Sequence, residues 1–175
     1  FCPSFVTVQG GKLRKAPLAA AAPSASTSVS WTQPLPEPRV PALDRTFSVL
    51  VGGIGGTGVV TIGQTLAMAA YVQGAFSSNL DVTGLSQKYG AVHSHVRFAP
   101  RPEGLHATRI AAGEADTLIG CDLIVAAGDE SLSRLKPGTG QGVACTDVIP
   151  TADFARNPDW QIDARALAAR LEASL

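Results

Sequence analysis

The chain has 175 residues, and its 14 Lys plus Arg balance 14 Asp plus Glu, so it carries no formal net charge at pH 7. This balance argues against an electrostatic grip on nucleic acid or on an anionic membrane. No apolar run approaches the roughly 20 residues that span a bilayer, and no signal-peptide pattern opens the chain. Cys2, Cys121 and Cys145 are too widely spaced for a disulfide framework, so we expect a soluble, cytoplasmic protein with no nucleic-acid and no membrane partner.

A segment rich in Pro, Ala and Ser over residues 16–45 predicts a linker or a surface-wrapping stretch. Proline removes a backbone donor and fixes φ, so it breaks helices and central strands. The prolines of this segment are Pro17, Pro23, Pro34, Pro36, Pro38 and Pro41. Residues 46–175 remain, roughly 130, which is enough for one domain with its own core.

An apolar run at 47–51 leads into a glycine-rich turn that opens a helix, expected at 58–73. The spacing of the glycines is the G-x-G-x-x-G of dinucleotide-binding loops, in which backbone N–H groups approach a phosphate. The candidate loop residues are Gly53, Gly55, Gly56, Thr57 and Gly58. The pattern leaves three interpretations open: a NAD(P) or FAD site, a site for another phosphate-bearing ligand or for a partner's backbone, and a purely structural turn.

A dinucleotide site also needs an acidic residue at the end of the next strand, to hold the ribose hydroxyls. The next strand is expected at 75–80, and Asp81 is the one candidate. The residues that follow it do not read as a crossover helix leading to a third buried strand. The self-contained NAD(P)- or FAD-binding oxidoreductase is therefore the alternative rather than the leading hypothesis.

Residues 91–98 alternate as a strand does, which puts Ser94 on one face and His93, His95 and Arg97 on the other. The basic face predicts either a carboxylate or phosphate pocket with Arg97 as the donor, or a structural arginine on a half-exposed sheet. A zinc site with His106 is disfavoured because no carboxylate or cysteine supports it at a suitable spacing. Residues 105–110 are expected to return as a second antiparallel strand.

The rest of the chain continues the alternation of strands and helices. Strands are expected at 123–127 and 143–146, and helices at 114–119, 130–135 and 164–173, the last two capped by Asp129 and Asp163. Glu130 and Arg134 are expected to pair. The fold class predicted is α/β, a three-layer Rossmann-like domain whose mostly parallel sheet carries an antiparallel hairpin near 91–110.

Catalytic residues are not apparent: the sequence holds no nucleophile elbow and no carboxylates at catalytic spacing, and Cys121 and Cys145 are expected to be inert core thiols. Cys2 precedes a proline, as does the fourth cysteine of a bacterial iron–sulfur run. It is the only candidate metal ligand, for a cluster whose other cysteines would lie upstream of Phe1.

Two strings together resemble the gamma domain of the 2-oxoacid:ferredoxin oxidoreductases, and among them the fused indolepyruvate ferredoxin oxidoreductases. They are VGGIGGTGVV at 51–60 and TGLSQKYGAVHSHVR at 83–97. The combination of Gln-Lys-x-Gly with Ser-x-Val-Arg downstream of a glycine loop is far more specific than the glycines alone. Tyr89 and His93 depart from the residues usual in this family.

The resemblance implies an enzyme that oxidatively decarboxylates an aryl 2-oxoacid, uses thiamine diphosphate, Mg²⁺ and a 4Fe–4S cluster, and passes electrons to ferredoxin and the acyl group to coenzyme A. Residues 1–15 would be the tail of a preceding iron–sulfur domain, 16–45 a linker, and 46–175 the gamma domain. That domain would bind coenzyme A and pack against the thiamine-binding domains, holds no cofactor of its own, and would be inactive alone; a homodimer is possible.

Carried over by position, the resemblance assigns the glycine loop Gly53, Gly55, Gly56, Thr57 and Gly58 to binding. It adds a neighbouring polar loop with Gln87 and Lys88, and the polar strand positions Ser94 and Arg97. Cys2 would be a cluster ligand in the full-length protein. If the loop and Arg97 act together, they favour a phosphate-bearing ligand such as coenzyme A over NAD.

Overall fold

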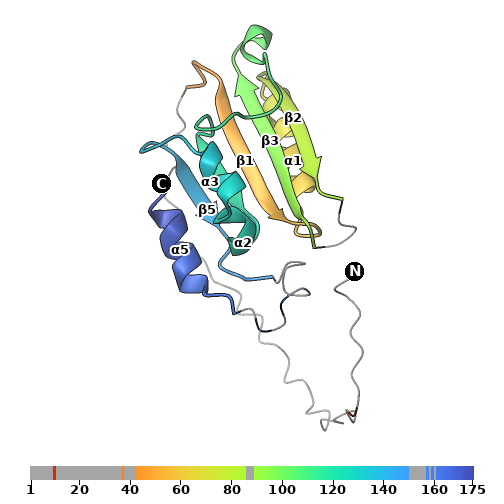
Figure 1. Ribbon diagram of the computed structural model, residues 1–175. Helices are drawn as coiled ribbons and strands as arrows, with labels where there is room; N and C mark the ends of the chain where they lie inside the picture. Colours follow the sequence, from red (N-terminus) through yellow and green to blue (C-terminus); the bar gives the residue numbers. More distant parts are fainter. Residues whose placement is uncertain are drawn as a thin grey trace. The chain divides into compact units, whose positions relative to one another are not determined.

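The computed structural model describes residues 10, 37, 42–85, 89–149, 157, 159 and 161–175. Within these, five strands form one sheet in the order β2-β3-β1-β4-β5. The strands are β1 (Phe47–Ile54), β2 (Phe76–Thr83), β3 (Ala91–Ala99), β4 (Thr117–Gly120) and β5 (Gln141–Ala144). The helices are α1 (Val59–Val72), α2 (Leu123–Ala126), α3 (Asp129–Arg134) and α5 (Ala164–Glu172), with a short 3-10 turn at Pro102–Gly104 (Figure 1).

One face of the sheet is covered by α1, which follows β1 directly. Val49, Val51 and Val96 of β1 and β3 pack there with Val59 at the start of the helix. The close approach depends on small residues, because a Cβ built on Gly63 of α1 would lie 2.0 Å from Ser94 Oγ on β3. The helix therefore lies close on β3, as its run of small and apolar residues predicts.

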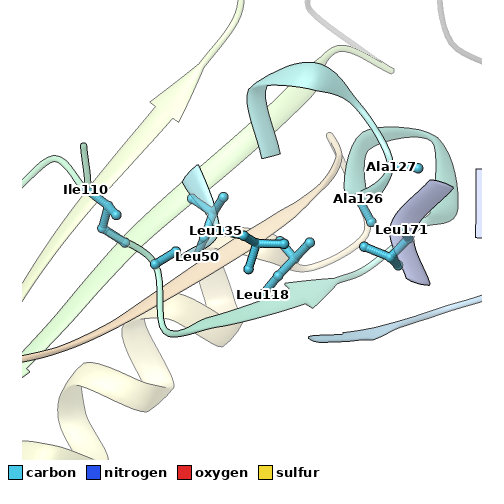
Figure 2. Packing of buried hydrophobic residues seen from close by; sticks show 8 residues of the cluster. Leu50, Ile110, Leu118, Ala126, Ala127, Leu135 and Leu171 are labelled. Atoms are coloured by element: carbon cyan, nitrogen blue, oxygen red, sulfur yellow. The ribbon is translucent and has the colours of Figure 1, made fainter. Parts of the chain in front are cut away.

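The opposite face is covered by α2, α3 and α5. Leu50 and Leu118, from the two central strands, are buried against Ala126 of α2 and Leu171 of α5. Figure 2 shows this cluster, with Ile110 at one end, Leu171 at the other and Leu135 between them. A packed core on each face makes the domain three layers thick, as predicted.

Four of the five strands run in the same direction, because β1 is parallel to β4, β4 to β5, and both β1 and β2 are antiparallel to β3. The α/β class and the mostly parallel sheet with an antiparallel strand at 91–99 are thus confirmed. The partner of that strand differs from the expectation. β3 forms its hairpin with the preceding β2, whereas residues 105–110 form no strand.

Two short elements have the opposite type from the one predicted. The expected helix at 114–119 is replaced by β4, and the expected strand at 123–127 is helix α2, because Asp122 Oδ1 accepts from the N–H of Val125 and caps it. The cap of α3 is also different: Gly128 is the N-cap and Asp129 is the first residue of the helix. The Asp163 cap of α5 is confirmed, since its carboxylate accepts from Arg165 N and Ala166 N.

No helix of the described residues combines the length and the apolar character needed to cross a membrane.

Candidate functional site

The glycine loop is a tight turn between β1 and α1. Both the N–H and the hydroxyl of Thr57 donate to the carbonyl of Ile54, at 3.0 and 2.7 Å. Gly56 and Gly58 have φ angles of +103° and +90°, in the region that favours glycine. Residues with a side chain would strain this turn, so its course depends on both glycines.

The glycines do different work within the loop. A Cβ on Gly53 would lie 2.6–2.8 Å from side-chain atoms of Thr57, Cys121 and Val59. These neighbours leave no room for a side chain at this position. Around Gly56 and Gly58 the reverse holds, since apart from each glycine and its two chain neighbours no heavy atom of the described residues lies within 4 Å of the position of a Cβ. These two glycines leave open space above the start of α1.

The open space is a depression of about 300 Å³ at the amino end of α1. It is lined by Gly55, Gly56, Gly58 and the first helical residues, with Thr83 of β2 and Val92 of β3 at its side. The N-cap Gly58 offers no side chain, and the first turn holds no acidic residue. The first N–H groups of a helix lack intrahelical acceptors and carry partial positive charge, so this end of α1 can bind an anion through its backbone.

Gly55 ties the loop to the segment before β3, because its N–H donates to Gly90 O at 2.8 Å. Gln87 and Lys88, the predicted polar loop, belong to the stretch of three residues before this contact that lies outside the described residues. The same is true of Cys2, the predicted cluster ligand.

Ser94 and Arg97 do not join the glycine loop. They lie on opposite faces of β3, and Ser94 is buried under α1, where its hydroxyl donates to Asn79 Oδ1 at 2.8 Å. Arg97 pairs in register with Ser48, whereas the loop begins after Ile54. Six residues of strand separate the two positions, about 20 Å at roughly 3.3 Å per residue.

Arg97 is a buried structural arginine. Its guanidinium donates to Glu114 Oε2 at 2.5 Å, to Ala107 O at 3.0 Å and to Ser48 Oγ at 3.3 Å. These contacts hold the segment between β3 and β4 against the sheet. Of the two interpretations given for the basic face, the geometry favours the structural one, and it does not support a shared site of Arg97 with the loop.

Sequence reasoning missed an arrangement of Ser131, His93 and Glu130. His93 Nε2 lies 3.1 Å from Ser131 Oγ, and Nδ1 lies 3.9 Å from Glu130 Oε2. The order resembles a nucleophile, base and acid, but Ser131 is fully buried and its hydroxyl donates to Val125 O at 2.6 Å. Burial also lowers the pKa of His93, although the Glu130 carboxylate acts in the other direction. The set ties α3 to β3 and presents no nucleophile to solvent.

The neighbouring His95 is fully buried, and its Nδ1 accepts from the N–H of Ile110 at 3.2 Å. Burial, reinforced by the charge of Arg134, lowers the pKa of His95 to about 4, so the ring is neutral at pH 7. His93 and His95 thus do not make a basic pocket. Within the described parts of the chain, no three His, Cys, Asp or Glu side chains gather as metal ligands would.

Asp81 does not stand where a dinucleotide-binding loop needs its acidic residue. In that motif the strand after the first helix lies beside the first strand. Here β3 lies between β1 and β2, and Asp81 pairs in register with Ser94 on the outer strand β2. The insertion of an antiparallel strand therefore argues against a NAD(P) or FAD site at the loop.

Comparisons with known proteins agree on one family. The family model of pyruvate ferredoxin/flavodoxin oxidoreductase matches residues 48–174. The indolepyruvate oxidoreductase subunits IorB of Thermococcus kodakarensis and Pyrococcus horikoshii are 28% and 27% identical to the chain over 106 residues. Each match covers 61% of this chain and 48% of the relative, so the chain spans about half the length of the curated relatives it matches.

Among solved structures, the chain is similar to the pyruvate oxidoreductase subunit PORC of Thermotoga maritima, at 17% sequence identity and a TM-score of 0.46. This match covers 65% of this chain and 56% of that chain.

Proposed function

Because the chain belongs to the pyruvate ferredoxin/flavodoxin oxidoreductase family, we propose that it is the gamma domain of an indolepyruvate (aryl 2-oxoacid):ferredoxin oxidoreductase. In the complete enzyme it contributes coenzyme A binding and domain packing to the oxidative decarboxylation of 2-oxoacids to acyl-CoA. Residues 46–175 form this domain, 16–45 are a linker, and 1–15 are the tail of a preceding iron–sulfur domain. The enzyme works in the cytoplasm, with ferredoxin as its electron acceptor.

The observation that carries the binding role is the open glycine loop. Its residues 54–58 bear no charge, and space is left above Gly56 and Gly58 where any other residue would place a side chain. Such a cradle suits a phosphate group held by backbone N–H groups at the start of α1. Coenzyme A carries phosphates of this kind and needs no acidic ribose ligand on β2.

The observation that supports domain packing is the outer face of α1. Surface helices normally carry charged residues on the side away from the core. The 14 residues of α1 include none, and Met68, Tyr71 and Val72 are 62%, 75% and 77% exposed. Since interface cores are depleted of charge, this face suits a thiamine-binding domain of the same enzyme that presents an uncharged surface.

Within the part of the chain that the structure describes, no group of three His, Cys, Asp or Glu side chains could hold the metals of the complete enzyme, Mg²⁺ and a 4Fe–4S cluster. We assign these metals and thiamine diphosphate to the other domains, with Cys2 as the single cluster ligand from this chain. The chain alone is therefore expected to show no decarboxylase activity.

The experiment that tests the binding role compares glycines of like geometry. Gly56→Ala and Gly58→Ala each put a methyl group into the cradle and strain a positive φ. Gly74→Ala is the matched control, because Gly74 has a φ of +79° and equally open surroundings among the described residues, but lies at the other end of α1. The measurement is calorimetric titration of the complete enzyme with coenzyme A and with NAD.

We expect the two loop variants to bind coenzyme A about tenfold more weakly, the loss of one hydrogen bond of about 1.4 kcal/mol, while Gly74→Ala binds as the parent does. NAD should bind more weakly than coenzyme A to every form. The loop would not be part of the coenzyme A site if all three variants, Gly56→Ala, Gly58→Ala and Gly74→Ala, bound coenzyme A with equal affinity.

A further inference from the structure

Two cysteines end neighbouring parallel strands beside the glycine loop. Cys121 follows β4 and Cys145 follows β5, whose last residues Gly120 and Ala144 are partners in register. The register ends at this pair, and the bond from Cys145 N to Gly120 O at 2.8 Å holds Cys145 beside the end of β4. Cys121 and Cys145 are thus the residues that directly follow the last pair in register.

Cys121 lies on the α1 side of the sheet, and side-chain alternation predicts the same side for Cys145. Cys121 packs with the cluster around Val51 and Val59, whereas Ala144 packs with the cluster on the opposite face. Side chains alternate along a strand, so Cys145 is expected to point to the same side as Cys121. Neighbouring strands are about 4.8 Å apart, within the Cα separation of about 4.4–6.8 Å that a disulfide bridges.

The two cysteines differ in access. Cys145 is exposed, so the expectation of a core thiol is wrong at this position, while Cys121 is partly buried below the loop. Burial raises the pKa of the Cys121 thiol, although a hydrogen bond with Thr57 acts in the other direction. An oxidant from solvent therefore reaches Cys145 first.

Cys121 is also part of the floor of the loop. Its Cβ lies 2.7 Å from the position that a Cβ on Gly53 would take, and Thr57 Oγ1 lies 2.6 Å from the same position. Movement of the Cys121 side chain toward β5 would thus remove a contact from beneath Gly53 and Thr57.

We propose that Cys121 and Cys145 are a thiol pair that hydrogen peroxide converts reversibly to a disulfide beside the glycine loop. The Cys145 thiolate attacks one peroxide oxygen, the O–O bond breaks, and the departing hydroxide takes a proton to leave as water. The resulting sulfenic acid is attacked by the Cys121 thiolate, the S–O bond breaks, and a second water leaves. Two thiols and one peroxide give one disulfide and two waters, and a dithiol reductant reverses the change.

This inference does not rest on the proposed coenzyme A site, because it concerns the thiols and the loop alone. The disulfide draws Cys121 toward β5 and loosens the turn above it, so loop amides 54–60 exchange faster with solvent in the oxidised protein.

The test uses the full chain carrying Cys2→Ser, reduced and then treated with hydrogen peroxide, digested without reduction and examined by mass spectrometry. We expect the peptides of Cys121 and Cys145 to be linked and lighter by two hydrogen atoms, and to separate with a dithiol. Cys121→Ser should instead leave a Cys145 sulfenic acid that dimedone traps, and Cys145→Ser should react more slowly at Cys121.

Two results would overturn the proposal. One is oxidation of Cys145 to the sulfinic acid without a linked peptide in the folded chain. The other is a linked pair that forms no faster in the folded chain than in urea, since register would then play no part. Unchanged hydrogen exchange over residues 54–60 in the linked form would refute the effect on the loop.

Discussion

The two ends of β1 differ in the charge of the side chains around them. At its amino end, the N–H of Ser48 donates to Asp116, whose carboxylate also accepts from Arg45 and Lys136, and Arg97 lies alongside with Glu114. At its carboxyl end, the loop and α1 continue for 19 residues, from Ile54 to Val72, without one charged side chain. Ion pairs close the charged end, whereas the described residues leave the uncharged end open.

This difference shows which residues are free to act on a ligand. A charged side chain that already has buried partners must break those contacts before it can bind anything else. A glycine turn at a helix start offers backbone N–H groups that have no such partners within the helix. In this domain the most basic strand is structural, and the candidate site that we propose lies where the sequence is least charged.

The largest effect at the closed end is expected from Asp116→Ala. Burial opposes ionisation of Asp116, but hydrogen bonds from Lys136, Ser48 N–H and Arg45 outweigh it and hold its pKa below the usual value. Removal of this acceptor loses three hydrogen bonds to a charged group and leaves the buried Ser48 N–H without its partner, so the free energy of unfolding measured by urea denaturation should fall by about 3–5 kcal/mol. Asp129→Ala, which breaks the exposed pair with Arg170, is the control and should cost about 0–1 kcal/mol. A similar small loss in both variants would contradict the view that this end is closed by its charges.

The next effect is the loss of stability in acid that the titration of His95 should cause. The folded pKa of His95 is about 4 against an ordinary value of 6.5, so between these values the unfolded chain binds more protons than the folded one. Stability from this group is complete above pH 6.5 and is lost as pH falls through about 4. The loss should be about 3 kcal/mol, at about 1.4 kcal/mol per pKa unit.

Urea denaturation between pH 7.5 and pH 4 measures this loss, with His95→Gln as the comparison. The glutamine oxygen can still accept from Ile110 N but does not titrate, so the variant should show a flatter dependence on pH. Burial also lowers the pKa of His93, so part of the dependence of stability on pH should remain in both proteins. Parallel curves for the two proteins would show that His95 is not the source.

The smallest expected effect tests most directly whether the two ends of β1 have different roles. Arg97→Ala should lower the free energy of unfolding by about 2 kcal/mol, because Ala107 O and Ser48 Oγ lose a buried donor. Coenzyme A affinity of the complete enzyme should stay unchanged, since Arg97 lies about 20 Å from the loop by strand geometry. Arg109→Ala, at an exposed arginine, is the control for loss of charge. Weaker coenzyme A binding in Arg97→Ala, with unaltered stability, would show that Arg97 is part of the coenzyme A site.

The long elements could be predicted from the sequence because their periodicity leaves little choice. The helix expected at 58–73 is α1 at Val59–Val72, and the alternation over 91–98 placed Ser94 and Arg97 on opposite faces of β3, as observed. In each case many residues carry the same signal. The expected pairing of Glu130 with Arg134 is likewise present, at 3.5 Å.

The short elements could not be predicted from periodicity, since four apolar residues fit a strand and a helical turn equally well. β4 and α2 are each four residues long, and the cap at Asp122 was the one local signal that distinguishes them. Contacts distant in sequence were also hidden. Arg97 contacts Glu114 because residues 100–113 fold back across β3, and no local sequence pattern predicts this.

The position of β3 also orders the folding of the domain. β2 and β3 are consecutive in the chain and pair along eight residues, and α1 packs on both of them, so this half is built from contacts between near neighbours. β4 reaches β1 only by closing a loop of more than 60 residues, from Val49 to Thr117. Since the entropy of loop closure precedes the gain from such contacts, the hairpin with α1 should assemble early. The pair β1–β4 should join late, so β4 and β5 are separate from the rest of the sheet for part of the folding of the chain.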